Sequence, residues 1–426
     1  MRFESLQKNE DFLTREFEKN KFTICLYYFA SVCNEADIFK KLISTFYRTE
    51  SAADYETYLK SFPNWSVRSS EAEAIEKMLD GHVIISIHEQ MISVSMRNFM
   101  SRSVDVSTDE NILQGPKDGL SENIETSLNL IRNRYKRKTL LVESHFVGND
   151  SNIKLIVLFD ETLAETTTLA TLKEKLSQLQ MTILQSAGQL QKNLIHNKFN
   201  LFPLFLTTER PDRVVKNLAE GKIVILLEGS SWGLIGPVTF FDFFKSMDDT
   251  VQMPIIGKFL LTLRYVALLI TLILPALYIS IISYSPDVLK VQFALLVAGS
   301  RMTVPFPSYI EIMFMLILTE FLIEASIRLP KTISPTATTV GGLILGQAAT
   351  EAGLVANVMI IVISVVAISN FVVPVNAMHQ AIRIIRYPLI LLASFLGTIG
   401  VVVGLLALLA YLCSLRSLGK PYMKLL

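Results

Sequence analysis

Residues 387–413 read YPLILLASFLGTIGVVVGLLALLAYLC and contain no charged side chain. Charged residues are concentrated in residues 1–258, whereas the chain from about residue 259 onward is mostly Leu, Ile, Val, Ala and Gly. An apolar run of about 20 residues is long enough to cross the hydrocarbon core of a bilayer. The sequence therefore predicts a hydrophilic half followed by an α-helical polytopic membrane domain.

Within this membrane domain, four apolar runs are long enough to span, and two half-length runs would be re-entrant or interfacial, so we expect four to five spans. The long runs are residues 265–283, 305–323, 353–373 and 387–413, and the short ones are 291–300 and 336–350. The distribution of Lys and Arg among the loops does not decide on which side of the membrane the C-terminal tail lies. With four spans the tail that carries Arg416 is cytoplasmic, and if residues 336–350 also cross, it lies outside.

The hydrophilic half alternates strand-like and helix-like patterns, which predicts an α/β region of two small subdomains. Strand patterns cover residues 21–30, 153–159 and a pair within 222–236, a hairpin pattern covers 81–96, and helical patterns cover 34–48, the stretch after Gly115-Pro116, and 161–195. We divide the chain into a charged N-terminal tail (1–20), α/β subdomains (21–145 and 146–255), the membrane domain (259–413) and a short C-terminal tail (414–426).

Several classes of function find no support in the sequence. The N-terminus is charged and lacks the apolar core of a signal peptide, so we expect the hydrophilic half to be cytoplasmic. A net charge of +1 without a basic and aromatic cluster gives no argument for nucleic acid. The three cysteines and five histidines match no metal spacing, and the glycines match neither a P-loop nor a dinucleotide fingerprint. We therefore expect no enzyme, no metal and no cofactor.

Three glutamates, Glu311, Glu320 and Glu324, belong to one predicted membrane segment or its end. A charge at mid-bilayer costs at least about 2.5–3.5 kcal/mol, so such residues usually face protein or water. One interpretation is a cation path or a ring of carboxylates in a homo-oligomer. The other is that Glu324 is interfacial and that one of the others pairs with Arg301 or Arg328. On a continuous helix Glu311 lies about 180° from Glu320, so the three cannot all line one pore.

Small residues recur in two apolar segments at helix-packing spacing. They form Gly342-x-x-x-Gly346, with Gly353 nearby, and Gly400-x-x-x-Gly404. Small residues at this spacing let two helix backbones approach closely. We expect these faces to pack against neighbouring helices or another subunit.

Residues 208–244 read TERPDRVVKNLAEGKIVILLEGSSWGLIGPVTFFDFF and precede the first apolar run. The motif is rich in residues of fixed geometry, and Pro211 would hold Arg210 and Asp212 in a fixed relative orientation. The candidate functional residues of this motif are Arg210, Pro211, Asp212, Gly229 and Pro237. One interpretation of Arg210 and Asp212 is a local ion pair, or a cap by Asp212 on a helix that begins near Arg213.

This motif resembles the signature that precedes the membrane domain of the GerA family, the A subunits of spore germinant receptors. Residues 115–136, GPKDGLSENIETSLNLIRNRYK, are similar to the second soluble signature of that family, and residues 301–333 resemble its Pro-Phe-Pro and Arg-Leu-Pro membrane motif. Residues 341–360 resemble its small-residue segment, and residues 414–422, SLRSLGKPY, resemble its closing motif. The likeness runs from about residue 115 to 422.

The resemblance implies a cytoplasmic domain attached to a multi-pass domain in the inner membrane of a dormant spore. It suggests that Arg210, Pro211, Asp212, Gly229 and Pro237 act as a coupling element between that domain and the membrane. It also implies a transporter-like B subunit and a lipoprotein C subunit as partners, and a homo-oligomeric ring in membrane lipid that conducts monovalent cations after a nutrient is sensed. Two alternatives stay open: a secondary transporter that binds a nutrient at the membrane midplane, and a non-conducting scaffold for partner subunits.

Overall fold

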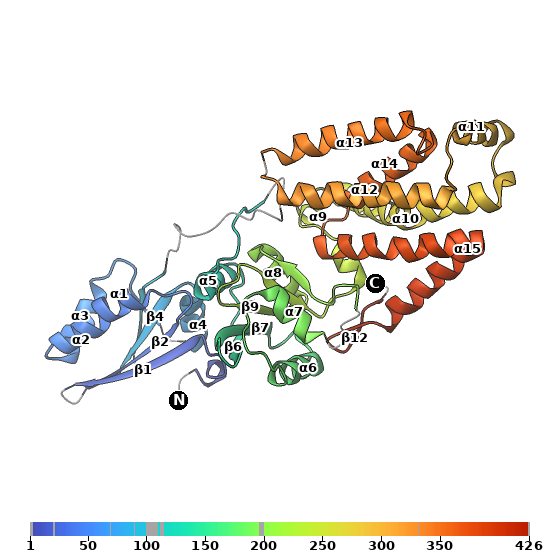
Figure 1. The fold of residues 1–426 in the computed structure, drawn as a ribbon. Coiled ribbons are helices and arrows are strands. Elements are labelled where there is room, and N and C mark those ends of the chain that lie inside the picture. The colour runs from blue at the N-terminus through green and yellow to red at the C-terminus, as the bar shows by residue number, and fades with distance from the viewer. Residues whose placement is uncertain are drawn as a thin grey trace. The chain divides into compact units, whose positions relative to one another are not determined.

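The structure is a computed structural model that describes residues 3–19, 22–68, 70–88, 90–98, 110, 115–195, 200–330 and 332–424. The chain forms two compact units, labelled by element in Figure 1. Unit 1 comprises Met1–Phe199, Leu204–Val238 and Ser417–Lys420, and unit 2 comprises Asn200–Pro203, Thr239–Arg416 and Pro421–Leu426. Each unit is described by itself.

The first sheet of unit 1 has the order β1-β2-β4-β5-β3, with every neighbouring pair antiparallel. Its strands are β1 (Phe12–Lys19), β2 (Phe22–Phe29), β3 (Ser66–Arg68), β4 (His82–Ile87) and β5 (Gln90–Ser95). Its helices are α1 (Glu35–Asp37), η2 (Ile38–Ile43), α2 (Ser44–Arg48), α3 (Ala52–Lys60) and α4 (Glu71–Leu79), and η1 (Glu4–Leu6) precedes β1.

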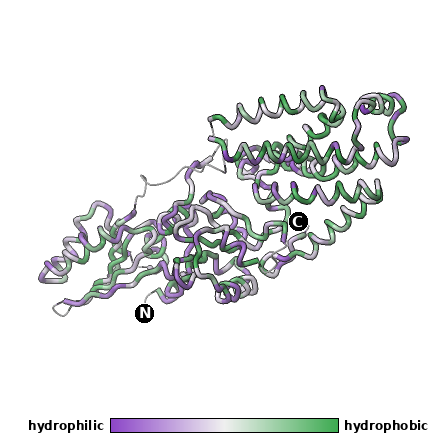
Figure 2. The backbone as a smooth tube through the Cα atoms, viewed as in Figure 1, coloured by the Kyte–Doolittle hydropathy of each residue, from purple (hydrophilic) through white to green (hydrophobic). Residues whose placement is uncertain are grey.

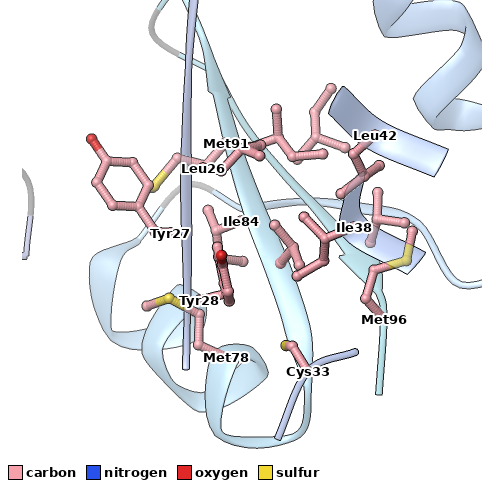
Figure 3. Packing of buried hydrophobic residues seen from close by; sticks show 14 of the residues in the cluster. Leu26, Tyr27, Tyr28, Cys33, Ile38, Leu42, Met78, Ile84, Met91 and Met96 are labelled. Carbon is pink, nitrogen blue, oxygen red and sulfur yellow. The ribbon is translucent and has the colours of Figure 1, made fainter. Parts of the chain in front are cut away.

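Side chains from this sheet and its helices share one core (Figure 3). Ile84 and Leu26 on neighbouring strands are fully buried, and Leu42 and Met78 from the helices belong to the same core. In residues 35–48 the apolar side chains recur every three or four positions, which places them on one helical face. The strand predicted over 21–30 is confirmed over Phe22–Phe29, and the helix predicted over 34–48 is confirmed from Glu35 to Arg48. The hairpin predicted over 81–96 is confirmed by the pairing of β4 with β5, and residues 21 and 89 lie outside the described part of the chain.

The second sheet of unit 1 has the order β6-β7-β9-β10-β8 and is also antiparallel throughout. Its strands are β6 (Leu140–Val147), β7 (Ile153–Asp160), β8 (Leu206–Thr208), β9 (Ile223–Leu227) and β10 (Gly233–Gly236). Its helices are α5 (Ile124–Arg134), α6 (Thr166–Ser177), α7 (Ala187–Leu194) and α8 (Pro211–Ala219). The two sheets confirm the predicted α/β region.

Two predicted boundaries in unit 1 are wrong. The tail expected over residues 1–20 contains β1, which pairs with β2 along its whole length. The strand is at the sheet edge, so the polar side of FLTREFEK stays in solvent and the segment resembles a charged tail. The division expected between residues 145 and 146 cuts β6, and the sheets separate instead between β5 and α5.

Unit 2 is helical, and hydrophobic residues line most of it (Figure 2). Its helices are η3 (Phe240–Phe244), α9 (Asp248–Val251), α10 (Pro254–Tyr284), η4 (Pro286–Val288), α11 (Val291–Arg301), α12 (Ser308–Arg328), α13 (Ser334–Glu351), α14 (Asn357–Phe371) and α15 (Asn376–Ser414). Within the described ranges, α10 and α15 are the two helices long and apolar enough to cross a membrane. The half-length run predicted at 336–350 belongs to α13, an uninterrupted helix of 18 residues.

Helix α15 folds back on itself at Gly397, whose φ of 60° and ψ of −137° are not helical. A Cβ on Gly400 would lie 2.1 Å from the carbonyl oxygen of Leu392. Residues eight apart in a straight helix are about 12 Å apart, so this contact requires two antiparallel legs. The uncharged run at 387–413, predicted as one span, therefore contains the turn of a helical hairpin.

The chain ends in a two-stranded hairpin, β11 (Arg416–Ser417) and β12 (Lys420–Pro421). Its two central residues, Leu418 and Gly419, have φ of 46° and 85°. Positive φ at both central residues is typical of two-residue hairpin turns. The closing motif at 414–422 is thus an ordered turn.

Candidate functional site

The motif TERPD places Arg210 as the residue before α8, with Pro211 as the first helical residue. Nε and Nη2 of Arg210 lie 3.0 and 2.7 Å from the two carboxylate oxygens of Asp212, in a bidentate ion pair across Pro211. Asp212 also accepts the backbone N–H of Arg213. The proline has no N–H to satisfy and its fixed φ suits the first turn of a helix. Local geometry thus agrees with the ion-pair interpretation of this motif.

Arg210 is buried, and its remaining donors hold a segment far away in sequence. Nη1 donates to the carbonyl oxygen of Glu110 and Nη2 to that of Pro116, at 3.2 and 3.1 Å. The Glu110 carboxylate accepts the hydroxyl of Thr208 at 2.9 Å and lies 3.3 Å from the Arg213 guanidinium. Burial raises the pKa of Glu110, and the nearby arginines oppose this shift only in part. The motif therefore holds Glu110 and Pro116 beside the second sheet.

The other half of the signature holds the start of α5. The N–H of Leu120 donates to Glu209 O at 2.6 Å, and the N–H of Gly229 donates to Glu122 O at 2.9 Å. Gly229 has φ of 76°, a conformation that favours glycine. The two soluble signatures, 115–136 and 208–244, are therefore joined to each other by backbone hydrogen bonds.

Pro237 follows β10 and precedes the passage of the chain from unit 1 into unit 2 at Val238. The neighbouring Gly236 leaves space for Leu418, because a Cβ there would lie 3.0 Å from Leu418 Cδ1 and from Phe205. Leu418 is buried in the core of the second sheet. Sequence reasoning missed this contact, and the only signal for it is the Leu-Gly pair in the closing motif.

Glu311, in the first turn of α12, is fully buried beside Arg301. Nη2 of Arg301 lies 3.1 Å from Glu311 Oε1, and Glu311 Oε2 accepts the backbone N–H of Ala356 at 3.2 Å. A buried carboxylate needs such partners because its desolvation is costly. The pairing with Arg301 is one of the two arrangements that the sequence left open.

Glu320, about two and a half turns further along α12, faces the first leg of α15. It forms ion pairs with Arg383 and Arg386 and accepts the hydroxyl of Tyr387 at 3.2 Å. One carboxylate therefore faces two guanidinium groups, and the cluster carries an excess positive charge. Glu324 is exposed and pairs with Arg328 one turn away at 2.7 Å. The three predicted carboxylates thus lie apart within the chain, each with an arginine.

The glycines predicted to pack helices fall into three groups. Gly400 and Gly404 lie where the legs of α15 approach, and a Cβ on Gly404 would stand 2.6 Å from Leu389. Gly342 faces Leu322 of α12, and Gly353 has φ of 64° beside the carbonyl of Thr303. Gly346 has no atom within 4 Å of its Cβ position, so its packing role stays a prediction.

A cavity of about 430 Å³ lies within unit 1, between residues of the two sheets. Its charged lining is mainly acidic, with Glu10, Asp11, Glu35 and Glu125 against Lys154. Cys33 also lines it, and burial raises the pKa of its thiol. Cavities of this size hold small molecules.

A buried ion pair stands at one wall of this cavity. Arg132 in α5 donates from Nε and Nη2 to Asp11 Oδ2, at 3.2 and 2.9 Å, and from Nη1 to Leu140 O. Asp11 also accepts the N–H and hydroxyl of Ser31. The pair joins the first sheet to α5 and β6. Among the residues that the structure describes, no group of three or more His, Cys, Asp or Glu could hold a metal ion.

These features define a class of protein: a two-sheet α/β unit continued by a helical unit that carries long apolar helices and buried ion pairs. The family model described as Bacillus/Clostridium GerA spore germination protein matches residues 3–426. The chain belongs to this family, as the motifs predicted.

Two relatives of similar length are about one-third identical to the chain. Spore germination protein GerLA of Bacillus cereus is 32% identical over 94% of this chain and 83% of its own length. Spore germination protein B1 of Bacillus subtilis (strain 168) is 32% identical over 98% of this chain and 88% of its own length. The crystal structure of the N-terminal domain of the A subunit of the Bacillus megaterium spore germinant receptor GerK3 is 20% identical, with a TM-score of 0.41 over 56% of this chain and 92% of that chain.

Proposed function

We propose that this chain is a membrane subunit of a nutrient germinant receptor and that it triggers spore germination. The observation that carries the proposal is the family match over residues 3–426, supported by relatives that are named spore germination proteins. The apolar helices α10 and α15 support a multi-pass location, which we assign to the inner membrane of the spore with unit 1 in the cytoplasm. The role is non-catalytic and needs no cofactor.

The proposed assembly is a homo-oligomer in the membrane that works with a transporter-like B subunit and a lipoprotein C subunit. In it the chain forms a ligand-gated conduit for monovalent cations. Glu320 is the carboxylate best suited to the ion path, because its side chain is 22% exposed whereas that of Glu311 is fully buried. In the conducting state Glu320 would have to leave Arg383 and Arg386, since two adjacent guanidinium groups repel a cation.

The arginine partners also favour a second candidate function, a non-conducting scaffold for the partner subunits. Each predicted carboxylate has a counter-ion within the chain, and an arrangement of this kind needs no permeant ion to balance it. A midplane transporter site gains less support, because the predicted broken segment at 336–350 lies in the uninterrupted α13.

The acidic cavity of unit 1 is a candidate place for a small ligand with a cationic group, such as the ammonium of an amino acid. Glu35 and Glu125 line this cavity. Asp11 pairs with the buried Arg132, whereas neither of these two glutamates has a buried ion-pair partner among the described residues. Replacing Glu125 with Gln should weaken binding of such a ligand to the purified full-length chain. Calorimetry would show this, and an unchanged affinity would place the ligand elsewhere.

Potassium release from spores after addition of a defined nutrient mixture tests the conduit. The comparison is between wild type, a deletion, Glu320→Gln and the matched control Glu324→Gln, whose carboxylate is exposed and paired only within its own helix. The conduit predicts that the deletion and Glu320→Gln lose a phase of release at normal protein level while Glu324→Gln retains it. Normal release in Glu320→Gln with loss in the deletion would favour the scaffold.

A further inference from the structure

Ser417 lies where the chain passes between its two units. Unit 1 resumes at Leu204 after the short segment Asn200–Pro203 and ends at Val238 before the helices. It also includes Ser417–Lys420, which begins three residues after the end of α15. The Ser417 hydroxyl donates to Leu204 O at 2.7 Å and accepts the N–H of Val238 at 3.0 Å. One buried hydroxyl therefore bridges the unit 1 residues at three of these passages.

Leu418 anchors the same segment in the core of unit 1. Its side chain is 4% exposed and belongs to the cluster that contains Phe205 and Leu234. The absence of a side chain at Gly236 makes room for it. Lys420 adds an ion pair with Glu165. The turn thus has specific apolar, polar and ionic contacts.

Unit 2 contains a matching arrangement of aromatic residues beside the same passages. Tyr422 is fully buried, and its carbonyl oxygen accepts the N–H of Phe240 at 2.9 Å. The hydroxyl of Tyr411 donates to Asn200 Oδ1 at 3.0 Å and accepts the N–H of Leu201 at 3.3 Å. In unit 2, too, the segments before and after each passage are held together.

The tether from the helix to the docked turn is short. Helix α15 ends at Ser414, and Ser417 is held three residues later. Three extended residues reach about 10 Å at most, so a larger displacement of the end of α15 must move the turn in unit 1. By the same constraint, a change in unit 1 that moves Leu204 or Val238 pulls on α15.

We propose that the closing segment, Ser414–Tyr422, transmits a change in unit 1 to the helices, with Ser417 and Leu418 as positioning residues. The proposal rests on the receptor function proposed above and adds a route for the signal. The sequence placed the coupling role in residues 208–244 alone. We assign it to the contact between Val238 of that motif and Ser417 of the closing segment. The proposal also places the closing segment on the same side of the membrane as unit 1.

Thiol labelling of the full-length protein in its native membrane tests the docking itself. Cys413 is an exposed natural thiol, so the background is Cys413→Ser. In this background Leu418→Cys should react with a maleimide at least about tenfold more slowly than Arg416→Cys, its exposed neighbour, because reaction requires local opening. Addition of a mixture of the twenty amino acids, glucose and inosine should raise the Leu418→Cys rate. Equal rates at the two positions, or a rate that the mixture leaves unchanged, overturns the proposal.

Potassium release from spores in the same mixture tests the transmission. Ser417→Ala and Leu418→Ala should slow release at least about fivefold at normal protein level. A fivefold change is the equilibrium ratio that corresponds to the loss of one net hydrogen bond. The matched controls are Ser414→Ala, whose hydroxyl bonds only within its own helix, and the volume-conserving Leu418→Met.

The outcomes separate the two proposals. Loss of release in the deletion with normal release in Ser417→Ala and Leu418→Ala overturns the transmission role and leaves the receptor function standing. Normal release in the deletion, after related receptors are removed, overturns the receptor function and the transmission role with it.

Discussion

Removal of the Asp11 carboxylate tests whether a buried ion pair holds the two sheets of unit 1 together. The side chains of Arg132 and Asp11 are 0% and 2% exposed, so neither charge is solvated by water. Asp11→Ala leaves the Arg132 guanidinium buried, with carbonyl oxygens as its hydrogen-bond partners and the Phe29 ring beside it. Loss of one member of such a pair costs about 3–5 kcal/mol of unfolding free energy.

For a domain of 150–250 residues, 1 kcal/mol corresponds to about 2–4 °C, so we expect Tm of unit 1 to fall by roughly 6–20 °C. The control is Glu161→Ala, which removes an exposed pair with Lys8 whose side chains are 75% and 48% exposed. Exposed pairs contribute about 0–1 kcal/mol, so this variant should melt within about 4 °C of the parent.

The assay is thermal unfolding of the full-length protein in detergent, followed by amide hydrogen exchange in β1 and β6. The double variant Asp11→Leu/Arg132→Met removes both charges and should recover most of the loss, because a buried pair and an apolar pair of similar volume are of similar stability. If Asp11→Ala melts within about 2 °C of Glu161→Ala, the pair does not hold the sheets together and the reasoning fails.

Three further predictions concern single positions. Burial raises the pKa of Glu110, so the folded state favours the protonated carboxyl; the stability gained in this way is fully present below the ordinary pKa of 4.5 and is lost as pH rises through the raised pKa. The protection of residues 115–123 from amide hydrogen exchange should therefore be greater at pH 4.5 than at pH 8, and Glu110→Gln should abolish the difference. Gly397→Ala forces an alanine into φ 60°, ψ −137° and against Tyr284 at 2.8 Å, so it should cost about 1–3 kcal/mol in thermal unfolding, whereas Gly346→Ala, with open space around it, should gain up to about 1 kcal/mol. Gly229→Ala meets no neighbouring atom but keeps φ 76°, so it should cost about 1–2 kcal/mol, and a stable variant at native Tm would refute the strain argument.

Two of the strands that the sequence predicted, β7 and β9, share a physical property: both of their faces are largely buried. In β9 every residue is buried, and in β7 all but the first two are, so a continuous apolar run identifies each of them. The edge strand β1 has one polar face, and β8 has only three residues. Neither gives a periodic signal strong enough to separate a strand from a polar tail or a loop.

The site could be predicted only where partners are near in sequence. The ion pair of Arg210 with Asp212 lies within one motif and follows from the fixed φ of Pro211. Glu320 and Arg386 are 66 residues apart, so no local pattern connects them. The turn at Gly397 is hidden for a different reason: hydropathy measures how apolar a residue is, and both legs of the hairpin are as apolar as a straight span.

The density of glycine and proline before the first apolar helix follows from what this part of unit 1 has to hold. Gly229 supplies the positive φ at which the chain hydrogen-bonds the start of α5, and Gly236 leaves the space that Leu418 fills. Neither role involves a ligand or a reaction, yet both fix backbone positions in the segment that leads from Gly229 to the passage at Val238. A larger side chain at Gly236 would displace Leu418, and with it the Ser417 hydroxyl that binds Val238. The special residues of the motif are therefore explained by close packing around the point where the helices begin and end.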